Sequence, residues 1–499
     1  MSEIPARVRG NLHLILPVAL YLLLRMPSLI EPQSYQDEAG YASTVWLTHL
    51  GYGLYVDAWN NKPPLLFGIF GLSRLLWGTN EAGLHAISVM SGLATMAAAL
   101  WGMARLYSAR AALWSGLVLA LVIGSPAFDG NLALPESLLI GPATVGVVWF
   151  VCSCADPSAR RPRVLVLVLI GLLLASAALI QQTALADFAA IMLWCLVRRN
   201  WRTMLILGGT VMTTGVVVLA PFVISAGAHN VWFALVSSYV PYLNYSLHAQ
   251  IASLVFRIVA IAAMVAAAWY FRNADDSRFE LVRIWATALL FAAIAEGYAY
   301  EHFLLPLMVP LVMLVTGILS RHRDQLLRRM RRPRVVLAGA TFALIASAGW
   351  SLFAAGYRSM VGSAGYYANA LSYMSGSISK VEYDGSFGAE IVGEQQAEQW
   401  ISSHGMVGAT AMLWTNLAWP LVDEELVPPT RSGPLYVTLA LEDGTVDILA
   451  RMEASPPQLI LITPVNIENL RDIRDFIATH AYRRVLDEHR VELYVRSDS

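Results

Sequence analysis

The chain has 499 residues, of which 57% are hydrophobic and 14% are charged, and its formal net charge is −1. This apolar share exceeds that of ordinary soluble proteins and excludes an ordinary soluble enzyme. Several runs are long enough to cross a hydrocarbon core about 30 Å thick as helices of about 20 residues. The composition therefore predicts a polytopic, mostly α-helical membrane protein.

Eleven apolar stretches have the length and composition expected of membrane-spanning helices. They cover residues 11–29, 82–106, 109–124, 136–154, 163–180, 183–198, 203–225, 251–271, 282–298, 303–319 and 335–355. The two stretches beside residues 181–183 also fit one bent helix pair with a tight turn. Two further apolar segments, 37–50 and 64–77, are too short to cross, and we predict that they lie as helices in the interface.

Arginines concentrate in alternate loops, most densely between 321 and 334, where the chain has seven. Because loops rich in Lys and Arg stay in the cytoplasm, the N-terminus is predicted to be cytosolic. The loop over 31–80 and the tail from Gly356 then lie outside. A basic run such as 321–334 also suits nucleic acid or lipid headgroups, but a topogenic loop explains it more simply. We therefore expect membrane lipids, and no nucleic acid, as partners.

The tail differs from the rest of the chain because helix and strand patterns alternate in it. Helices are predicted over 389–404, 434–452 and 467–480, strands over 407–414 and 459–462, and a closing hairpin over 485–495. This alternation indicates a small α/β domain. The chain is thus predicted to comprise a transmembrane domain, residues 1–355 with the external loop 31–80, and an external α/β domain, residues 356–499, whose role stays open.

The external loop carries the most informative polar residues. Asp37 and Glu38 directly follow the first apolar stretch. A carboxylate at the bilayer edge needs water, a cavity or a partner, although two solvated acids at a helix N-terminus are the simpler explanation. Lys62, one of only two lysines in the chain, precedes two prolines that fix the backbone and begin a helix. A lysine held this rigidly suits an anionic headgroup, whereas a snorkelling lysine needs no such frame.

Further charged residues are predicted to lie on the same side of the membrane. Glu136 begins a membrane helix directly after a proline, where helix capping also explains it. Glu301 and His302 stand in a short external turn. Arg25 and Arg257 lie a turn or two inside the external boundary. Buried cations at that depth need anionic partners, either a lipid phosphate or a glutamate.

Together these motifs resemble those of membrane glycosyltransferases of the GT-C fold, particularly the bacterial branch related to protein O-mannosyltransferases and lipid A aminoarabinose transferases. The resemblance covers about residues 10–355. It rests on the Asp-Glu pair, on Asn-Lys-Pro-Pro at 61–64, on the acid after Leu-Pro at 134–136, and on the stretches 179–185 and 302–307. The tail resembles the external domain that many members carry.

The resemblance implies a polyprenyl-phosphate sugar donor and transfer at the outer face of a bacterial cytoplasmic membrane. It matches Asp37 to the family's essential first-loop acid, Lys62 to the lysine that contacts the donor phosphate, and Glu136 to a second acid that is usually Asp. In that branch a glutamate that helps to hold a metal stands where this chain has Asn61. Because an amide is a weaker ligand than a carboxylate for most divalent ions, this departure leaves a bound divalent metal an open question, and the sequence assigns no cofactor with certainty.

We accordingly expect direct, inverting transfer to an acceptor hydroxyl on a glycan, a lipid or a protein. The leaving polyprenyl phosphate is a stable anion that needs a cation, which Lys62 supplies together with Arg257 or Arg25. Asp37 is the expected base for the acceptor proton. Orienting roles are expected for a larger set of polar side chains, namely Glu38, Glu136, Tyr35, Tyr41, Asn61, Glu301 and His302. The residues leave open whether the sugar is mannose, another hexose, aminoarabinose or arabinofuranose.

Two other classes of function fit parts of the sequence. A transporter or flippase also carries charged residues in its membrane spans, and a scaffold would use the tail to bind partners. Transporters often show repeated halves and helices broken at mid-membrane. The sequence shows neither pattern, and its charges gather at one face of the membrane, so the enzyme is the favoured interpretation.

Overall fold

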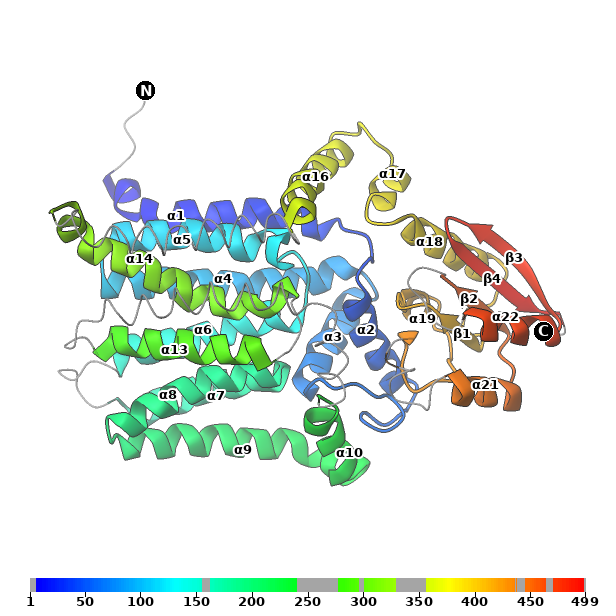
Figure 1. The fold of residues 1–499 in the computed structure, drawn as a ribbon, viewed down its shortest axis with the longest axis horizontal. Coiled ribbons are helices and arrows are strands. Elements are labelled where there is room, and N and C mark those ends of the chain that lie inside the picture. The colour runs from blue at the N-terminus through cyan, green and yellow to red at the C-terminus, as the bar shows by residue number, and fades with distance from the viewer. Residues whose placement is uncertain are drawn as a thin grey trace.

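The computed structural model describes residues 6–154, 162–239, 277–295, 300–328, 356–435, 437, 445–463 and 470–497. Long helices lie side by side through one part of the molecule, and a small sheet with its own helices lies at the opposite end (Figure 1). Two shorter helices, α2 (Gln36–His49) and α3 (Pro64–Trp77), lie between the long helices and the sheet (Figure 1). The mostly helical fold class with a C-terminal mixed sheet is confirmed.

The long helices follow the predicted stretches closely. They are α1 (Ala6–Arg25) with the turn η1 (Met26–Leu29), α4 (Glu81–Leu106), α5 (Ala109–Gly124), α6 (Pro135–Ser153), α7 (Val164–Ile180), α8 (Leu185–Val197), α9 (Trp201–Ala226), α13 (Ser277–Ala295) and α14 (Leu305–Arg328). Four segments in the described part of the chain are long and apolar enough to cross a membrane: α4, α6, α9 and Glu301–Ser320. The predicted stretches 251–271 and 335–355 lie outside the described residues.

Local sequence explains where these helices begin and how closely they pack. The Asn80 side chain caps α4 by accepting a hydrogen bond from the Ala82 N–H at 2.9 Å. Helices α4 and α6 pack closely where two small residues, Ser91 and Gly141, face each other. A Cβ on Gly141 would lie only 2.6 Å from Ser91 Oγ, so a larger residue would not fit there. The same Ser91 hydroxyl oxygen accepts a hydrogen bond from the Gly141 N–H at 3.0 Å. Small residues and hydroxyl contacts of this kind hold membrane helices together.

Helices α2 and α3 confirm that the two short apolar segments are helical. Tyr41 of α2 packs edge-on against Phe70 of α3, with 5.5 Å between the ring centroids. On its other side α2 contacts the C-terminal region, where Trp46 Nε1 donates a hydrogen bond to the Leu426 carbonyl at 2.8 Å. Helix α2 is therefore held between α3 and the C-terminal region, and its place in the bilayer interface stays a prediction.

The C-terminal region contains a four-stranded mixed sheet. Its elements are α16 (Gly356–Met374), α17 (Lys380–Gly385), α18 (Ala389–Ser403), β1 (Ala411–Trp414), α19 (Trp419–Asp423), α21 (Thr445–Ala454), β2 (Leu459–Ile462), α22 (Leu470–Thr479), β3 (Tyr482–Glu488) and β4 (Val491–Arg496). The strand order is β1-β2-β4-β3, with β1 and β2 parallel and the other pairs antiparallel. The predicted closing hairpin is thus confirmed.

Alternate residues of the sheet pack against helices on its two faces. Leu459 and Leu461 of β2 pack in a cluster with Ile401 of α18, whereas Ile460 and Ile462 pack with Phe476 of α22. This period of two is the one that a strand imposes on its side chains. The predicted short buried strand is therefore the centre of an α/β arrangement with helices on both faces.

Two details of the tail differ from the prediction. The strand expected from residue 407 begins only at Ala411, because Gly408 has φ +79° and interrupts the extended backbone. Helices α16, α17 and α19 were not predicted. Of the helix expected over 434–452, the structure describes helical residues at Leu435 and Val437 and α21 from Thr445, and residues 436 and 438–444 lie outside the described residues.

Glu394 of α18 makes the stability of this region depend on pH. Burial raises the pKa of its carboxyl to about 8, although the hydroxyls of Thr463 and Thr415 donate hydrogen bonds to Oε1 at 3.0 and 3.2 Å and partly offset that effect. An unfolded Glu has a pKa of about 4.3. Between the two values the folded state holds a proton that the unfolded state lacks, so stability should fall as pH rises.

Glu394→Gln should therefore flatten the pH dependence of unfolding between about pH 5 and pH 8. Hydrogen exchange of the β1 and β2 peptides in the full-length protein, at several pH values in that window, measures the effect. Glu488→Gln, a change at an exposed position on β3, is the matched control and should keep the slope of the wild type. Equal slopes for Glu394→Gln and the wild type would contradict the prediction.

Candidate functional site

The first turn of α2 directs the two predicted acids to different places. Tyr35 precedes the helix in an extended conformation, with φ −108° and ψ 126°. Adjacent residues of a helix point about 100° apart around its axis. Asp37 stays partly exposed, whereas Glu38 is fully buried, with 0% of its surface exposed. The two neighbouring carboxylates therefore have different surroundings and cannot share one role.

Asp37 belongs to a set of polar side chains that four segments bring together. Burial raises the pKa of the Tyr35 phenol, and the negative charges of Asp37, Asp129 and Glu136 raise it further. His302 Nδ1 lies 2.9 Å from Asp129 Oδ2. We call these five residues (Tyr35, Asp37, Asp129, Glu136 and His302) the Asp37 group. They come from α2 and the residue before it, the loop before α6, the first turn of α6, and the turn η5 (Glu301–Leu304).

Asp129 is the member of this group that the sequence analysis did not select. It ends the turn η2 (Pro126–Phe128) with φ 52° and ψ 28°, a left-handed conformation that Asp adopts more readily than most residues. This backbone directs the loop before α6, and the side chain pairs with His302. A usable signal was present, because Asp129 stands in the same predicted external loop as Glu136.

Glu136 is buried at the wall of a cavity. It is 2% exposed, and its Oε1 has no hydrogen-bond partner among the residues that the structure describes. Gln181 and Phe303 line the same cavity. The stretches 179–185 and 302–307, which carried the looser part of the family resemblance, therefore meet beside Glu136. A buried carboxylate oxygen without a partner is costly and suits a hydroxyl of a bound substrate.

The Lys62 loop has the rigid frame that its sequence predicts. The Lys62 N–H donates a hydrogen bond to Asn60 Oδ1 at 3.3 Å, and the Tyr55 hydroxyl donates one to the Lys62 carbonyl at 3.0 Å. Asn60 in turn donates a hydrogen bond to Thr44 of α2 at 3.2 Å. Lys62 itself is 9% exposed. Its position is thus fixed by side chains rather than by the two prolines alone.

The same loop is anchored at the cavity wall. Gln182 Nε2 donates a hydrogen bond to the Asn61 carbonyl at 2.9 Å. Gln182 directly follows Gln181, which lines the cavity that contains Glu136. The structure therefore connects the Lys62 loop to the region of the predicted acids, although the two segments are far apart in the sequence.

Of the two predicted arginines the structure describes Arg25, which contacts the loop before α6 and helix α4. Arg25 is 1% exposed, and its guanidinium donates hydrogen bonds to the Gly130 carbonyl and, at 3.0 Å, to Ser88 Oγ. These contacts hold the loop before α6 against α4, which favours a structural role. Arg257 lies outside the described residues.

Three predicted positioning residues lie around this region. Tyr41 is 7% exposed and packs in the apolar contact between α2 and α3. Asn61 offers its backbone carbonyl to Gln182. Glu301 is partly buried and directly precedes His302 in η5. Tyr41 is therefore built into the fold, whereas Glu301 adjoins the Asp37 group.

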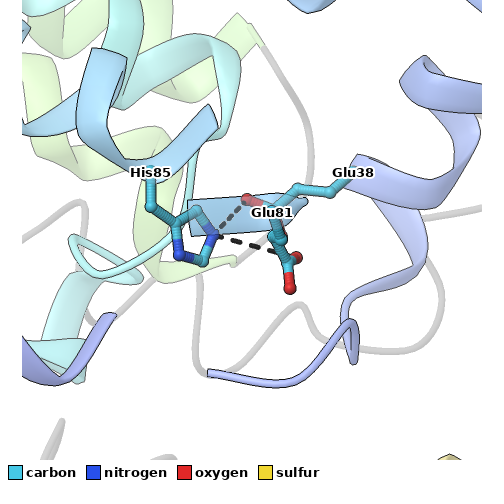
Figure 2. A group of neighbouring side chains, drawn as sticks. All are labelled: Glu38, Glu81 and His85. Atoms are coloured by element: carbon cyan, nitrogen blue, oxygen red, sulfur yellow. Dashed lines mark hydrogen bonds and ion pairs between the residues drawn. The ribbon is translucent and has the colours of Figure 1, made fainter. Parts of the chain in front are cut away.

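Glu38 faces a second polar cluster, which the sequence analysis did not identify. Figure 2 shows Glu38 of α2 pointing toward Glu81 and His85, which stand one turn apart on α4. Glu38 Oε1 lies 3.1 Å from His85 Nε2 and accepts a hydrogen bond from the Ala133 N–H at 2.5 Å. Although burial acts to raise the pKa of Glu38, the positive charge of His85 outweighs burial and holds that pKa below its usual range. Glu38 therefore contacts His85 and Ala133 in this structure, and its role in orienting substrate hydroxyls stays a prediction.

Solved structures of other proteins have a fold similar to that of this chain. The chain is 17% identical to ArnT from Cupriavidus metallidurans bound to undecaprenyl phosphate, with a TM-score of 0.62 over 97% of this chain and 98% of that chain. For the apo state of the same protein the identity is 16% and the TM-score 0.61, over 98% of each chain. No family model and no curated protein sequence matches the chain.

A second solved protein shares the architecture more distantly. The apo form of the Archaeoglobus fulgidus oligosaccharyltransferase is 11% identical, with a TM-score of 0.51 over 91% of this chain and 70% of that chain. These similarities extend over the long helices and the C-terminal region alike. The chain therefore has the GT-C fold, as its motifs predicted.

Proposed function

We propose that this chain, which has the GT-C fold of ArnT over nearly its full length, is a membrane glycosyltransferase that uses a polyprenyl-phosphate sugar. The observation that carries the proposal is the Asp37 group, whose member Glu136 lines a cavity with Gln181, next to the residue that holds the Lys62 loop. Proton acceptors and a fixed cation are what transfer from a lipid phosphate to a hydroxyl requires. The ArnT structure of the same fold has undecaprenyl phosphate bound, which supports a lipid phosphate as the leaving group.

In the proposed reaction the acceptor oxygen attacks the anomeric carbon of the sugar, and the bond from that carbon to the phosphate oxygen breaks. This direct displacement inverts the anomeric configuration. The acceptor proton passes to Asp37, the more exposed of the two adjacent acids. The electron pair of the broken bond leaves with the polyprenyl phosphate, and Lys62 stabilises the negative charge that gathers there.

The other members of the Asp37 group position the substrates. The Asp129 carboxylate accepts a hydrogen bond from His302 Nδ1 and so fixes the plane and tautomer of the imidazole. Glu136 offers a buried oxygen to a sugar or acceptor hydroxyl. Positioning of this kind contributes to rate because it holds the reacting atoms in line.

A panel of donors tests the proposal. Purified protein in nanodiscs would be incubated with undecaprenyl phosphate carrying mannose, glucose, aminoarabinose or arabinofuranose, together with membrane lipid, glycan and protein acceptors. Mass spectrometry should detect free undecaprenyl phosphate and a glycosylated acceptor for at least one pair, and far less of both with Asp37→Asn over the same time. Movement of an intact labelled donor across liposomes, without turnover of any donor, would favour the transporter instead.

The proposal includes an orientation for this integral membrane protein. We assign it to a bacterial cytoplasmic membrane, with the N-terminus cytosolic and residues 356–499 forming an external domain, because its arginine-rich loops alternate. In a background without the three native cysteines, a cysteine at the exposed Ser455 should react with a membrane-impermeant maleimide on intact spheroplasts. A cysteine at Ser277 should react only after permeabilisation. Labelling of Ser277 from outside would reverse the orientation.

A further inference from the structure

We infer that Glu38, Glu81 and His85 form a buried binding site for one divalent metal ion, zinc by the chemistry of the donors. None of the three side chains is a member of the Asp37 group, and the inference does not depend on the proposed function. It also differs from the metal position that the family resemblance implies, which falls on Asn61. In the described part of the chain these three residues are the one set of His, Cys, Asp or Glu with metal-binding spacing.

The distances suit a small ion. One ligand atom from each residue lies within 4.8 Å of the others, and all three side chains are buried. His85 Nε2 is 3.1 Å from Glu38 Oε1 and 3.8 Å from Glu81 Oε1 (Figure 2). Tetrahedral zinc holds N and O ligands at about 2.0–2.2 Å, so two ligand atoms are about 3.3 Å apart. Small side-chain shifts therefore bring all three atoms onto one ion.

The imidazole is already oriented as a ligand. His85 Nδ1 lies 2.5 Å from the Ser28 carbonyl, which only accepts, so Nδ1 carries a hydrogen. In the neutral ring the lone pair of Nε2 then points toward Glu38 and Glu81. Metal-binding histidines usually donate their other N–H to a carbonyl or carboxylate in this way. The Ala133 N–H orients the Glu38 carboxylate similarly, with a hydrogen bond at 2.5 Å.

Two carboxyl oxygens of the cluster are buried without a hydrogen-bond partner in the described part of the chain. Glu38 Oε2 and Glu81 Oε2 have no hydrogen-bond partner among the residues that the structure describes, although the residues are 0% and 6% exposed. A buried carboxyl oxygen without a partner is costly. The Glu38 and Glu81 carboxyls also hydrogen-bond each other, and a ligand that binds oxygen would replace that contact and take up these two atoms.

The local charge also calls for a cation. Glu31 adds negative charge near His85 and Glu38, and Asp423 adds it near Glu81. The guanidinium of Arg25 donates hydrogen bonds to the Gly130 carbonyl and to Ser88 Oγ. One divalent ion would balance the charges of two carboxylates and take the imidazole as a third ligand.

One residue of this buried cluster borders a cavity, and the cluster connects segments that carry the Asp37 group. Glu81 lines a cavity between α3, α4 and α19, with Asn80 and Trp419 also in its wall, which provides an entry path for an ion. Bound metal would join α2, which carries Asp37, to α4 and to the loop that carries Asp129. We therefore assign it the purpose of fixing these segments, not of contacting the sugar.

Metal content tests the site in untagged, full-length protein that has been dialysed against a chelator and then supplied with Zn²⁺. Mass spectrometry of the washed protein should find one zinc per chain, and Co²⁺ should give the visible absorption of a tetrahedral ion. His85→Arg keeps a positive charge beside Glu38 but removes the ligating nitrogen. It should remain folded and lose stoichiometric metal, as should Glu81→Gln.

The control is Glu394→Gln, which alters a buried carboxyl that has two hydroxyl partners and no histidine nearby. It should keep one metal per chain. Monodisperse elution and unchanged tryptophan fluorescence show that each variant is folded. No metal in the wild type after supplementation, or equal metal in folded His85→Arg, would overturn the inference and leave the cluster as a protonated His85 paired with Glu38.

Discussion

Asp37→Asn should lower the rate of sugar transfer by about 10²–10⁴-fold, the usual contribution of a general base. The change keeps the shape of the side chain and removes its ability to accept a proton. Donor binding should survive or tighten, because a negative charge near the phosphate is removed. Single-turnover transfer and equilibrium binding of the donor, measured on the same preparation, separate the two effects.

The matched control is Asp57→Asn, at an exposed position in the same loop. It should retain full activity. Glu38→Gln should act differently from Asp37→Asn, because Glu38 contacts His85 and Ala133, whereas Asp37 belongs to the Asp37 group. The main effects of Glu38→Gln should be on the stability and the metal content of the protein. An active Asp37→Asn beside an inactive, fully folded Glu38→Gln would reverse the two assignments.

Lys62→Ala should weaken donor binding by about tenfold to a hundredfold, because a charge-assisted contact to a phosphate contributes about 1.5–3 kcal/mol. Folding should be nearly unaffected, since the hydrogen bonds from Tyr55 and to Asn60 use the Lys62 backbone, which alanine retains. Titration of the protein with undecaprenyl phosphate measures the loss directly.

The chain supplies its own control in Lys380, the other lysine. Its side chain is exposed and its ammonium lies 2.6 Å from the buried Asp384 of α17, in the C-terminal region, so Lys380→Ala should leave donor binding unchanged. Lys62→Arg should recover part of the affinity, because it restores the charge in a different shape. Equal donor affinity for Lys62→Ala and the wild type would mean that Lys62 does not bind the donor phosphate and only helps to set the membrane topology.

The sequence by itself determined the membrane helices and the helices α2 and α3. An apolar run of about 20 residues has one stable solution in a bilayer, in which each backbone group bonds within its own helix. Prolines and caps such as Asn80 then set the starts locally. The rigid frame of Lys62 could also be predicted from the sequence, because the residues that restrain its backbone lie within a few positions of it.

Only the tertiary structure decided which polar side chains meet. Glu38 was predicted to act beside Asp37, but it bonds to His85 and Ala133, which are 47 and 95 residues away. Asp129 joins the group through His302, 173 residues distant, and Arg25 reaches Gly130 across 105 residues. The direction of a side chain on α2 depends on what packs against each face of that helix. No local pattern specifies those neighbours, so the Asp37 group and the cluster of Glu38, Glu81 and His85 emerge only when the distant segments are assembled.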